Sequence, residues 1–357
     1  MKKWGCLLCL IVYGCLPEGD ENLFLPLNDL PAPLEKYMEG KKIYFGSLHG
    51  HTFYSDGTQS PLGVLQWAKD TVHFDFYAIT DHGEQLTEAE WNDLKRKTDS
   101  LTINGKFVAL RGFEWSSNVY GHCCVFNTEL YTGANSIPEF SGLIQWLTEH
   151  NAMAQFAHPG RGGNVFDSLA FIPAAGKIFF AIETANRNYF NSHHYYLPFY
   201  PMALRQGWHV GPSANQDNHS SVIYPQRTAL IADDLSPEGI KEAMIKRRMY
   251  ATDDPNVLIL FKHGKTWMGD SVSWQGKTTF LVIIKDDEPI RQVQLINATE
   301  EIICEYIPAR PINQLCWYPS TTITGRQCIF VKVYSVNLKD GNEPIQVAVT
   351  APIWFLP

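Results

Sequence analysis

Short apolar runs alternate with amphipathic segments from about residue 42 to residue 232. Runs rich in β-branched and aromatic residues predict strands, and the amphipathic segments between them predict helices. The predicted strands are residues 42–48, 74–80, 107–111, 152–157, 178–184, 209–213 and 228–232. Alternating strands and helices are typical of β/α units around a mainly parallel sheet, so we expect an α/β fold in this part of the chain.

Three of the predicted helices begin with recognisable capping residues. Ser60 and Ser236 each stand directly before a proline, which is a favoured residue at the first position of a helix. Thr87 and Glu90 have the spacing of a capping box, in which each side chain bonds to the backbone of the other residue. These starts place helices between the predicted strands.

The pattern changes at Pro255, where helical periodicity ends and alternating apolar runs such as 257–261 and 279–284 recur between turn residues. This pattern predicts a small all-β sandwich, immunoglobulin-like in architecture, over residues 255–357. We expect the chain before it to contain a signal segment (1–15), a Pro-rich linker (16–40) and the α/β domain (41–254).

The first residues have the features of a bacterial lipoprotein signal. Lys2 and Lys3 precede an apolar run over residues 4–13 that is too short for a permanent membrane span. The run ends in Val-Tyr-Gly-Cys, which resembles a lipobox that would place a lipid anchor on Cys15. We therefore expect an exported lipoprotein, membrane-anchored in the periplasm or at the cell surface; a plain secretory peptide and a buried N-terminal strand are the alternatives.

Composition and charge narrow the classes of partner. The 357 residues are 45% hydrophobic and carry a formal net charge of -8, with no run of more than three Lys or Arg after the signal segment. Bulk nucleic-acid binding is therefore disfavoured, while a small anionic substrate is not. The cysteines after Cys15 are odd in number and lack metal-site spacing, so one disulfide among Cys304, Cys316 and Cys328 and free buried thiols both stay open.

Histidines and acidic residues gather at the ends of predicted strands. The first strand runs into His49-Gly50-His51, and similar endings follow the second, third, fourth and sixth strands. In a parallel barrel the loops that leave the carboxyl ends of the strands meet at one mouth. A single His-x-His pair is more often hydrogen-bonded than metal-bound, but several such endings in strand order indicate a shared metal site. The candidate ligands are His49, His51, Asp56, His82, Glu114, His122, His158, Asp217 and His219.

These motifs resemble those of the PHP family, the polymerase and histidinol phosphatase domains, and occur in the same order over about residues 43–233. The resemblance implies a distorted (β/α)7 TIM-like barrel with two or three divalent ions, Zn, Mn or Fe, at its mouth. It also implies a first metal on His49, His51, Glu114 and Asp217, a second on Glu114, His122 and His158, and a third on Asp56, His82 and His219. One departure is that Asn215 and Gln216 precede Asp217, where the family commonly has Gly and Ser.

The segment 248–252 and the closing β domain resemble a bacterial subgroup of exported or lipid-anchored PHP metallohydrolases. This subgroup includes ester and carbamate hydrolases. The resemblance therefore leaves open which bond is cleaved.

The expected chemistry is hydrolysis. Clustered divalent cations can generate hydroxide from water at neutral pH, so no protein nucleophile is needed. The sequence has no Gly-x-Ser-x-Gly elbow and no phosphate-cradling Gly-rich loop. We expect a phosphoesterase that uses a metal-activated hydroxide on a small or polymer-end phosphate. A carboxylic-ester, amide or carbamate hydrolase and a non-catalytic surface binding protein with structural metals are the alternatives.

Two of the candidate catalytic residues, Glu114 and Asp217, are metal-ligand candidates that would act through the metal centre. Asp81 stands next to His82, and we expect it to orient an imidazole rather than to bind a metal. The site is thus predicted to include carboxylates that bind metal and a carboxylate that orients a ligand.

Arginines also follow strand ends. Arg161 lies in a Gly-rich segment after His158, and it is the first candidate for binding an anionic group of the substrate. Arg187 and Arg227 occupy comparable positions, where each could bind an anion or brace a loop.

Overall fold

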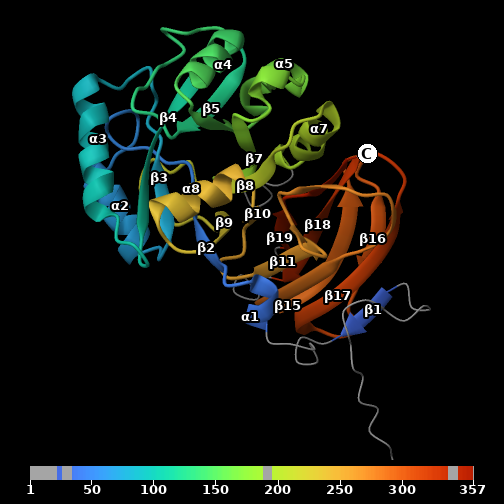
Figure 1. The fold of residues 1–357 in the computed structure, drawn as a ribbon. Helices are drawn as coiled ribbons and strands as arrows, with labels where there is room; N and C mark the ends of the chain where they lie inside the picture. Colours follow the sequence, from blue (N-terminus) through green and yellow to red (C-terminus); the bar gives the residue numbers. More distant parts are fainter. Residues whose placement is uncertain (1–21, 26–33, 188–194, 337–344, 357) are drawn as a thin grey trace, which may run out of the picture.

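The computed structural model describes residues 22–25, 34–187, 195–336 and 345–356, in two connected parts (Figure 1). The predicted signal segment, with Cys15, and most of the predicted linker lie outside the described residues. The first part is a distorted barrel with helices around it, and the second is built from strands. No helix among the described residues is long and apolar enough to span a bilayer.

The strands of the barrel follow one another in chain order. β2 (Lys42–Ser47), β3 (Phe76–Ile79) and β4 (Val108–Ser117) are parallel neighbours. β6 (Met153–Ala157), β7 (Phe179–Asn186) and β8 (Gly211–Asn215) form a second parallel run. The expected mainly parallel sheet is confirmed, and the predicted strands begin and end within two residues of the observed bounds, except that β4 continues to Ser117, beyond its predicted end at residue 111.

β5 (Gly121–Phe126) joins the two parallel runs and is antiparallel to both β4 and β6. The reason is the length of its connection, because only residues 118–120 separate β4 from β5. A parallel neighbour needs a crossover of a dozen residues or more, whereas an antiparallel hairpin needs only a tight turn. The hairpin brings Glu114 on β4 opposite Cys124 on β5.

The barrel closes through the segments that follow β2 and β8. The backbone N–H of His51 donates to the carbonyl of Asn218 (2.9 Å), and the N–H of Asp217 donates to the carbonyl of His49 (3.0 Å). β9 (Arg227–Ala232) lies on the other edge of β2 in antiparallel pairing, and β10 (Met249–Thr252) is antiparallel to β9. The residues that close the barrel therefore include candidate metal ligands.

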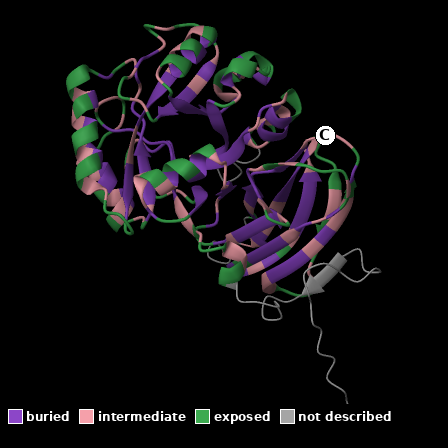
Figure 2. Cartoon of the chain, viewed as in Figure 1, coloured by how far each residue is buried: buried purple, intermediate pink, exposed green. Residues whose placement is uncertain are grey.

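Helices cover the outside of the barrel, with buried inner faces and exposed outer faces (Figures 1 and 2). The predicted caps are confirmed: Ser60 and Ser236 accept backbone N–H bonds, and Thr87 and Glu90 form a capping box. The longer helices are α2 (Pro61–Asp70), α3 (Glu88–Leu101), α4 (Phe140–Glu149), α7 (Phe199–Gln206) and α8 (Pro237–Ile245). Shorter ones are α1 (Leu34–Met38), η2 (Arg161–Gly163), α5 (Phe166–Leu169) and η3 (Pro173–Ala175).

The second part is all-β, as the alternating pattern predicts. Its long strand β15 (Leu281–Asn297) pairs through its first half with β11 and β17, and through its second half with β16 and β18. The neighbouring strands are β11 (Leu258–His263), β12 (Thr266–Trp267), β13 (Ser271–Ser273), β14 (Gly276–Thr279), β16 (Ile302–Tyr306), β17 (Ile312–Ile323), β18 (Gln327–Val336), β19 (Ile345–Thr350) and β20 (Ile353–Leu356). The short β1 (Asn22–Leu25) pairs with β17.

The two parts share hydrogen bonds and core. β10, which follows the barrel helices, pairs with β9 on one side and with β19 on the other. One apolar cluster includes Leu230 and Tyr250 together with Ile284 and Val331 of the all-β part. Side chains buried against each other in this way hold the two parts in a fixed arrangement.

The cysteines of the described residues form no disulfide. Cys123 and Cys124 lie fully buried in β5, and Cys316 and Cys328 are buried in the all-β part. Cys304 is partly exposed on β16 and is likewise not joined in a disulfide.

Candidate metal centre

The predicted ligands converge at the mouth of the barrel, which is the end of the barrel formed by the carboxyl ends of its parallel strands. His49 and His51 follow β2, His82 follows β3, and His158 follows β6. The structure brings all nine candidates into four overlapping groups. Within each group the potential ligand atoms lie within 4.8 Å of one another. The groups are His51, Asp56, His82 and His219; His49, His51 and Glu114; His49, His158 and Asp217; and Glu114, His122 and His158.

Glu114 lies at the centre of the cluster and is 1% exposed. Its carboxylate oxygens lie 3.0–3.5 Å from ring nitrogens of five histidines. These are His49, His51, His82, His122 and His158. Burial alone would raise the pKa of Glu114, but the surrounding imidazoles, His49 foremost, hold it well below its usual value. A carboxylate with imidazoles on both of its oxygens has the surroundings of a bridging ligand.

Two imidazoles point the same nitrogen at each other. The Nε2 atoms of His49 and His51 are 3.2 Å apart. Each ring is held from its other side, because His49 Nδ1 contacts Glu183 Oε1 at 2.9 Å and His51 Nδ1 contacts Ser55 Oγ at 3.3 Å. With Nδ1 as donor, each Nε2 presents a lone pair, and two lone pairs at this distance repel. A metal ion between the rings would satisfy both lone pairs at once.

The donor set fits divalent metals. Neutral imidazoles and carboxylates in this mixture are ligands for Zn, Mn or Fe. The group of Glu114, His122 and His158 coincides with the set expected for the second metal. The set expected for the first metal is divided between two groups, and the set expected for the third gains His51.

The group around Asp56 is the most open to solvent. The Asp56 side chain is 48% exposed, and its Oδ1 lies 3.1 Å from His219 Nε2 and 3.6 Å from His82 Nε2. Burial raises the pKa of Asp56, but the hydrogen bonds from His219 and His82 outweigh it and lower the pKa. This edge of the centre is where a substrate can approach.

Glu183 is a member of the site that sequence reasoning missed. It lies fully buried on β7, where its carboxylate contacts His49 Nδ1 and accepts bonds from the backbone N–H of His158 (2.7 Å) and from Asn215 Nδ2 (3.0 Å). A carboxylate behind an imidazole fixes its tautomer and its orientation. The available signal was an acidic residue inside the predicted apolar strand 178–184.

Replacing Glu183 tests this role. The Glu183→Gln variant is expected to bind its metals roughly 10- to 100-fold more weakly, because the amide no longer fixes the His49 tautomer. Competition against a fluorescent chelator measures the affinity. Glu129→Gln is the matched control, since Glu129 pairs with Arg111 away from the centre. Equal metal affinities in the two variants would show that Glu183 does not support the metal centre.

Asp81 is buried beside the centre, and it does not contact the ring of its sequence neighbour His82. It accepts bonds from Thr52 N (2.7 Å), Thr52 Oγ1 (2.7 Å) and Ser55 Oγ (2.6 Å). It therefore reaches an imidazole through Ser55, and that imidazole is His51 rather than the adjacent His82. His82 Nδ1 instead contacts Ser116 Oγ at 2.6 Å. Asp81 positions the loop that follows the first two histidines.

Two arginines contact the candidate ligand Asp217. Arg161 Nη1 and Arg187 Nε lie 2.9 and 3.0 Å from Asp217 Oδ2, and Arg161 Nη2 donates to Asn186 Oδ1 (2.6 Å). Burial works against the charged form of Arg161, but the Asp217 carboxylate outweighs it and raises the pKa. Both side chains are more than a third exposed, at 36% and 37%, so they face both the metal ligands and solvent.

Arg227 is not part of this centre. Its guanidinium lies 4.6 Å from the ring centroid of Phe74, and its Nη1 donates to the backbone carbonyls of Tyr224 and Gln226. Because it lies on β9, outside the barrel strands that carry the ligands, it braces a loop and does not bind an anion at the mouth.

The backbone is strained at the mouth. His158, Arg187 and Asp217 have φ values of 28°, 52° and 45°, which non-glycine residues rarely adopt. Such conformations cost about 1–3 kcal/mol each and persist where the surroundings hold them, often at functional sites. At His158 and Asp217 the strain lies on candidate ligands themselves.

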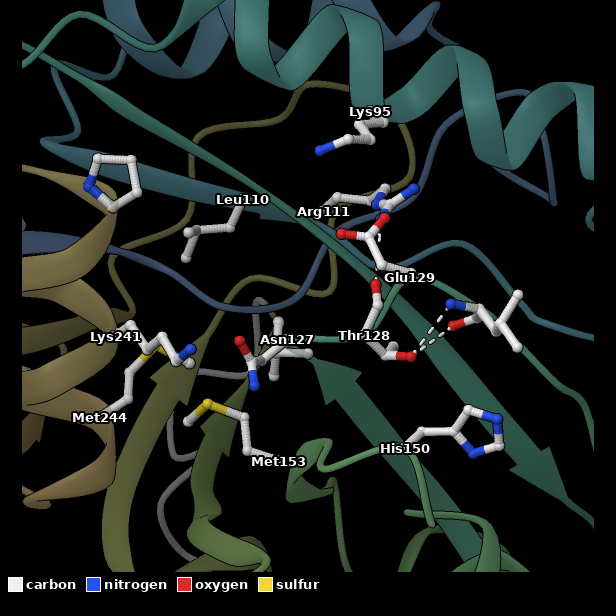
Figure 3. Close-up of a pocket in the computed structure, with 13 residues that line it drawn as sticks. Lys95, Leu110, Arg111, Asn127, Thr128, Glu129, His150, Met153, Lys241 and Met244 are labelled. Atoms are coloured by element: carbon white, nitrogen blue, oxygen red, sulfur yellow. Dashed lines mark hydrogen bonds and ion pairs between the residues drawn. The ribbon is translucent and has the colours of Figure 1, made fainter. Parts of the chain in front are cut away.

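A separate cavity of about 530 Å3 lies at the other end of the barrel (Figure 3). Leu110 and Met153 line it at the ends of β4 and β6 that are remote from Glu114 and His158. Lys95 from α3 and Lys241 from α8 also point toward it (Figure 3). This cavity shares no residue with the metal centre.

No protein-family model and no curated protein matches the sequence. Among solved structures, a two-domain protein from Bacteroides vulgatus that contains a predicted PHP-like metal-dependent phosphoesterase is similar. The two sequences are 16% identical, the alignment covers 87% of this chain and 96% of that chain, and the TM-score is 0.49. A similarity of this degree does not by itself indicate function.

Proposed function

We propose that this protein is a metal-dependent hydrolase and, within that class, a phosphoesterase that acts on a small or polymer-end phosphate. The observation that carries the proposal is the convergence of nine imidazole and carboxylate side chains on one mouth, with Glu114 among five histidines. Divalent cations held there would lower the pKa of a water molecule and offset negative charge on the reacting oxygens.

The protein's own groups prepare this centre. Glu183 holds His49, and Ser55 holds His51, so the Nε2 atoms of both rings are directed inward. Ser116 fixes His82 in the same manner. Ligands that are already oriented lose little freedom when a cation binds, which favours both affinity and reactivity.

The two arginines support an anionic substrate. Arg161 and Arg187 lie beside Asp217 on the solvent side of the centre, and each keeps about a third of its side chain exposed. Guanidinium groups bind phosphate oxygens through paired, charge-assisted hydrogen bonds. A neutral ester or amide would leave these positive groups without a partner in the substrate.

Replacing Arg161 separates a phosphate from a neutral substrate. In the Arg161→Met variant, kcat/KM for a phosphomonoester is expected to fall about 10- to 100-fold, the equivalent of one or two charge-assisted hydrogen bonds. Hydrolysis of a neutral carboxylic ester should change little. Steady-state assays of both substrates measure the difference, with Arg96→Met as control because Arg96 is exposed on α3. An equal loss on both substrates would mean that Arg161 only holds Asp217.

A substrate panel tests the proposal as a whole. Purified protein loaded with Mn or Zn should release phosphate from simple mono- or diesters. Turnover of carboxylic esters, amides or carbamates without any phosphate release would overturn the phosphoesterase assignment in favour of that hydrolase class. If metals bind fully and no substrate of any class is hydrolysed, the binding-protein alternative is favoured.

A further inference from the structure

A second group of acidic side chains lies where the barrel part meets the all-β part, away from the histidines. Asp253 and Asp254 follow β10, while Asp286 and Glu288 lie in the middle of β15. Asp254, Asp286 and Glu288 are 2%, 7% and 5% exposed. Acidic residues are almost never buried this far unless their charge is paired or coordinated.

Strand pairing brings these residues together with two polar side chains. Leu258 is opposite Lys285, so the chain just before β11 and the chain just after Lys285 face each other. Ser335 of β18 is opposite Gln346 of β19, and directly opposite residues of antiparallel strands share one face of the sheet. Ser335 Oγ donates to Asp286 Oδ2 at 2.8 Å, which connects that face to the acidic group.

Two buried side-chain oxygens at this place have no hydrogen-bond partner among the described residues. Asp254 Oδ1 accepts the N–H groups of Asn256 and Val257, each at 2.9 Å, but Asp254 Oδ2 is buried and has no hydrogen-bond partner among the described residues. The side-chain oxygen of Gln346, a residue that is 7% exposed, is also buried without such a partner. Both atoms are acceptors without a donor among the described residues, one from the loop after β10 and the other from β19.

Asp254 and Asp286 are the two acidic residues of this group whose surroundings among the described residues lack a paired cation. No Lys or Arg among the described residues forms an ion pair with Asp254 or Asp286. Burial lowers the pKa of Arg227, and the charge of Asp254 partly offsets this effect. Arg227 Nη1 nevertheless donates to backbone carbonyls and forms no ion pair with Asp254 among the described contacts. Burial, and then the charge of Asp286, raises the pKa of Asp254 to about 7, and burial likewise raises the pKa of Asp286. A bound cation or bound protons would neutralise Asp254 and Asp286.

We propose that Asp254, Asp286 and the side-chain oxygen of Gln346 form a binding site for Ca2+, distinct from the histidine centre. All of these donors are oxygens, and Ca2+ prefers carboxylate and amide oxygens in flexible arrangements of six to eight ligands. Histidine and cysteine, which would favour Zn, are not among them. The ion would join the loop after β10 to β15 and β19, so it would stabilise the junction of the two parts.

Thermal unfolding with and without Ca2+ tests the site in the full chain. The protein is first freed of metals and reloaded with Zn or Mn at the histidine centre. Addition of about 1 mM Ca2+ is expected to raise the unfolding midpoint by about 3 °C or more, because a ligand that binds only the folded state stabilises it. The same concentration of Mg2+ should have a smaller effect, and radioactive Ca2+ should bind with one ion per chain.

Three variants decide where the ion binds. Asp254→Asn should lose the Ca2+-dependent shift while still folding, because it removes a buried charge without changing shape. Asp287→Asn is the matched control, since Asp287 is the exposed neighbour of Asp286 and should keep the shift. Glu114→Gln should also keep it. If Asp254→Asn does not fold, Gln346→Leu takes its place. An absent shift in the parent protein, or a shift that Glu114→Gln removes and Asp254→Asn retains, overturns the proposal.

Discussion

The Glu114→Gln variant is expected to lose hydrolysis by about 1,000-fold or more, since a metal centre supplies several kcal/mol to the transition state and each 1.4 kcal/mol is tenfold in rate. Glu114 contacts five histidines, so an amide in its place removes the one negative charge that all five share. Elemental analysis should show a lower metal content in the variant, and the turnover number should be compared at saturating metal.

The control for this variant is its fold. The circular dichroism spectrum of Glu114→Gln should stay close to that of the parent, with both proteins measured at saturating metal. Glu129→Gln should behave as the parent in every assay. Undiminished turnover in Glu114→Gln would contradict a catalytic metal centre. Collapse of folding, together with an inactive parent, would instead support metals that serve only structure.

Removal of the metals is the second change with a large expected effect. Dialysis against a strong chelator should abolish hydrolysis, and stoichiometric Zn or Mn should restore it. The unfolding midpoint should fall on removal and rise again on reloading, because the cations bind only the folded arrangement of ligands. Calorimetry and elemental analysis on the same samples measure both effects. Full activity at a metal content well below one ion per chain would contradict the proposed function.

The strands and the convergence of the candidate ligands could be predicted because their signals are local. Apolar runs such as 152–157 and 178–184 mark buried strands, and a histidine or an acid directly after such a run lies at the end of the barrel where the loops converge. His49 and His158 are therefore visible in the sequence as candidates. Their grouping around particular metals is not, since it depends on side-chain directions that no spacing encodes.

Other parts of the site depend on tertiary contacts. Glu183 reads as one polar residue inside an apolar strand, and only the folded barrel shows that it supports His49. Arg187 and Arg227 look alike in sequence, but Arg187 meets Asp217 while Arg227 stacks on Phe74. The difference arises because β9 pairs antiparallel to β2 instead of continuing the parallel run.

The acidic group at the junction of the two parts could not be predicted from the sequence either. Asp254 and Asp286 stand in different segments, each of which reads as an ordinary polar turn. They meet because β10 pairs with both β9 and β19, and because β15 changes partners in its middle. Neither pairing has a local sequence signature.

The closure of the barrel has a consequence for how the active form is assembled. The hydrogen bonds between residues 49–51 and 217–218 join the first strand to the last, and His49, His51 and Asp217 stand on that line. A cation that binds all three would link the segment after β2 to the segment after β8. It would therefore stabilise the closed barrel as well as take part in the reaction, and the metal-free chain would open more readily along this edge.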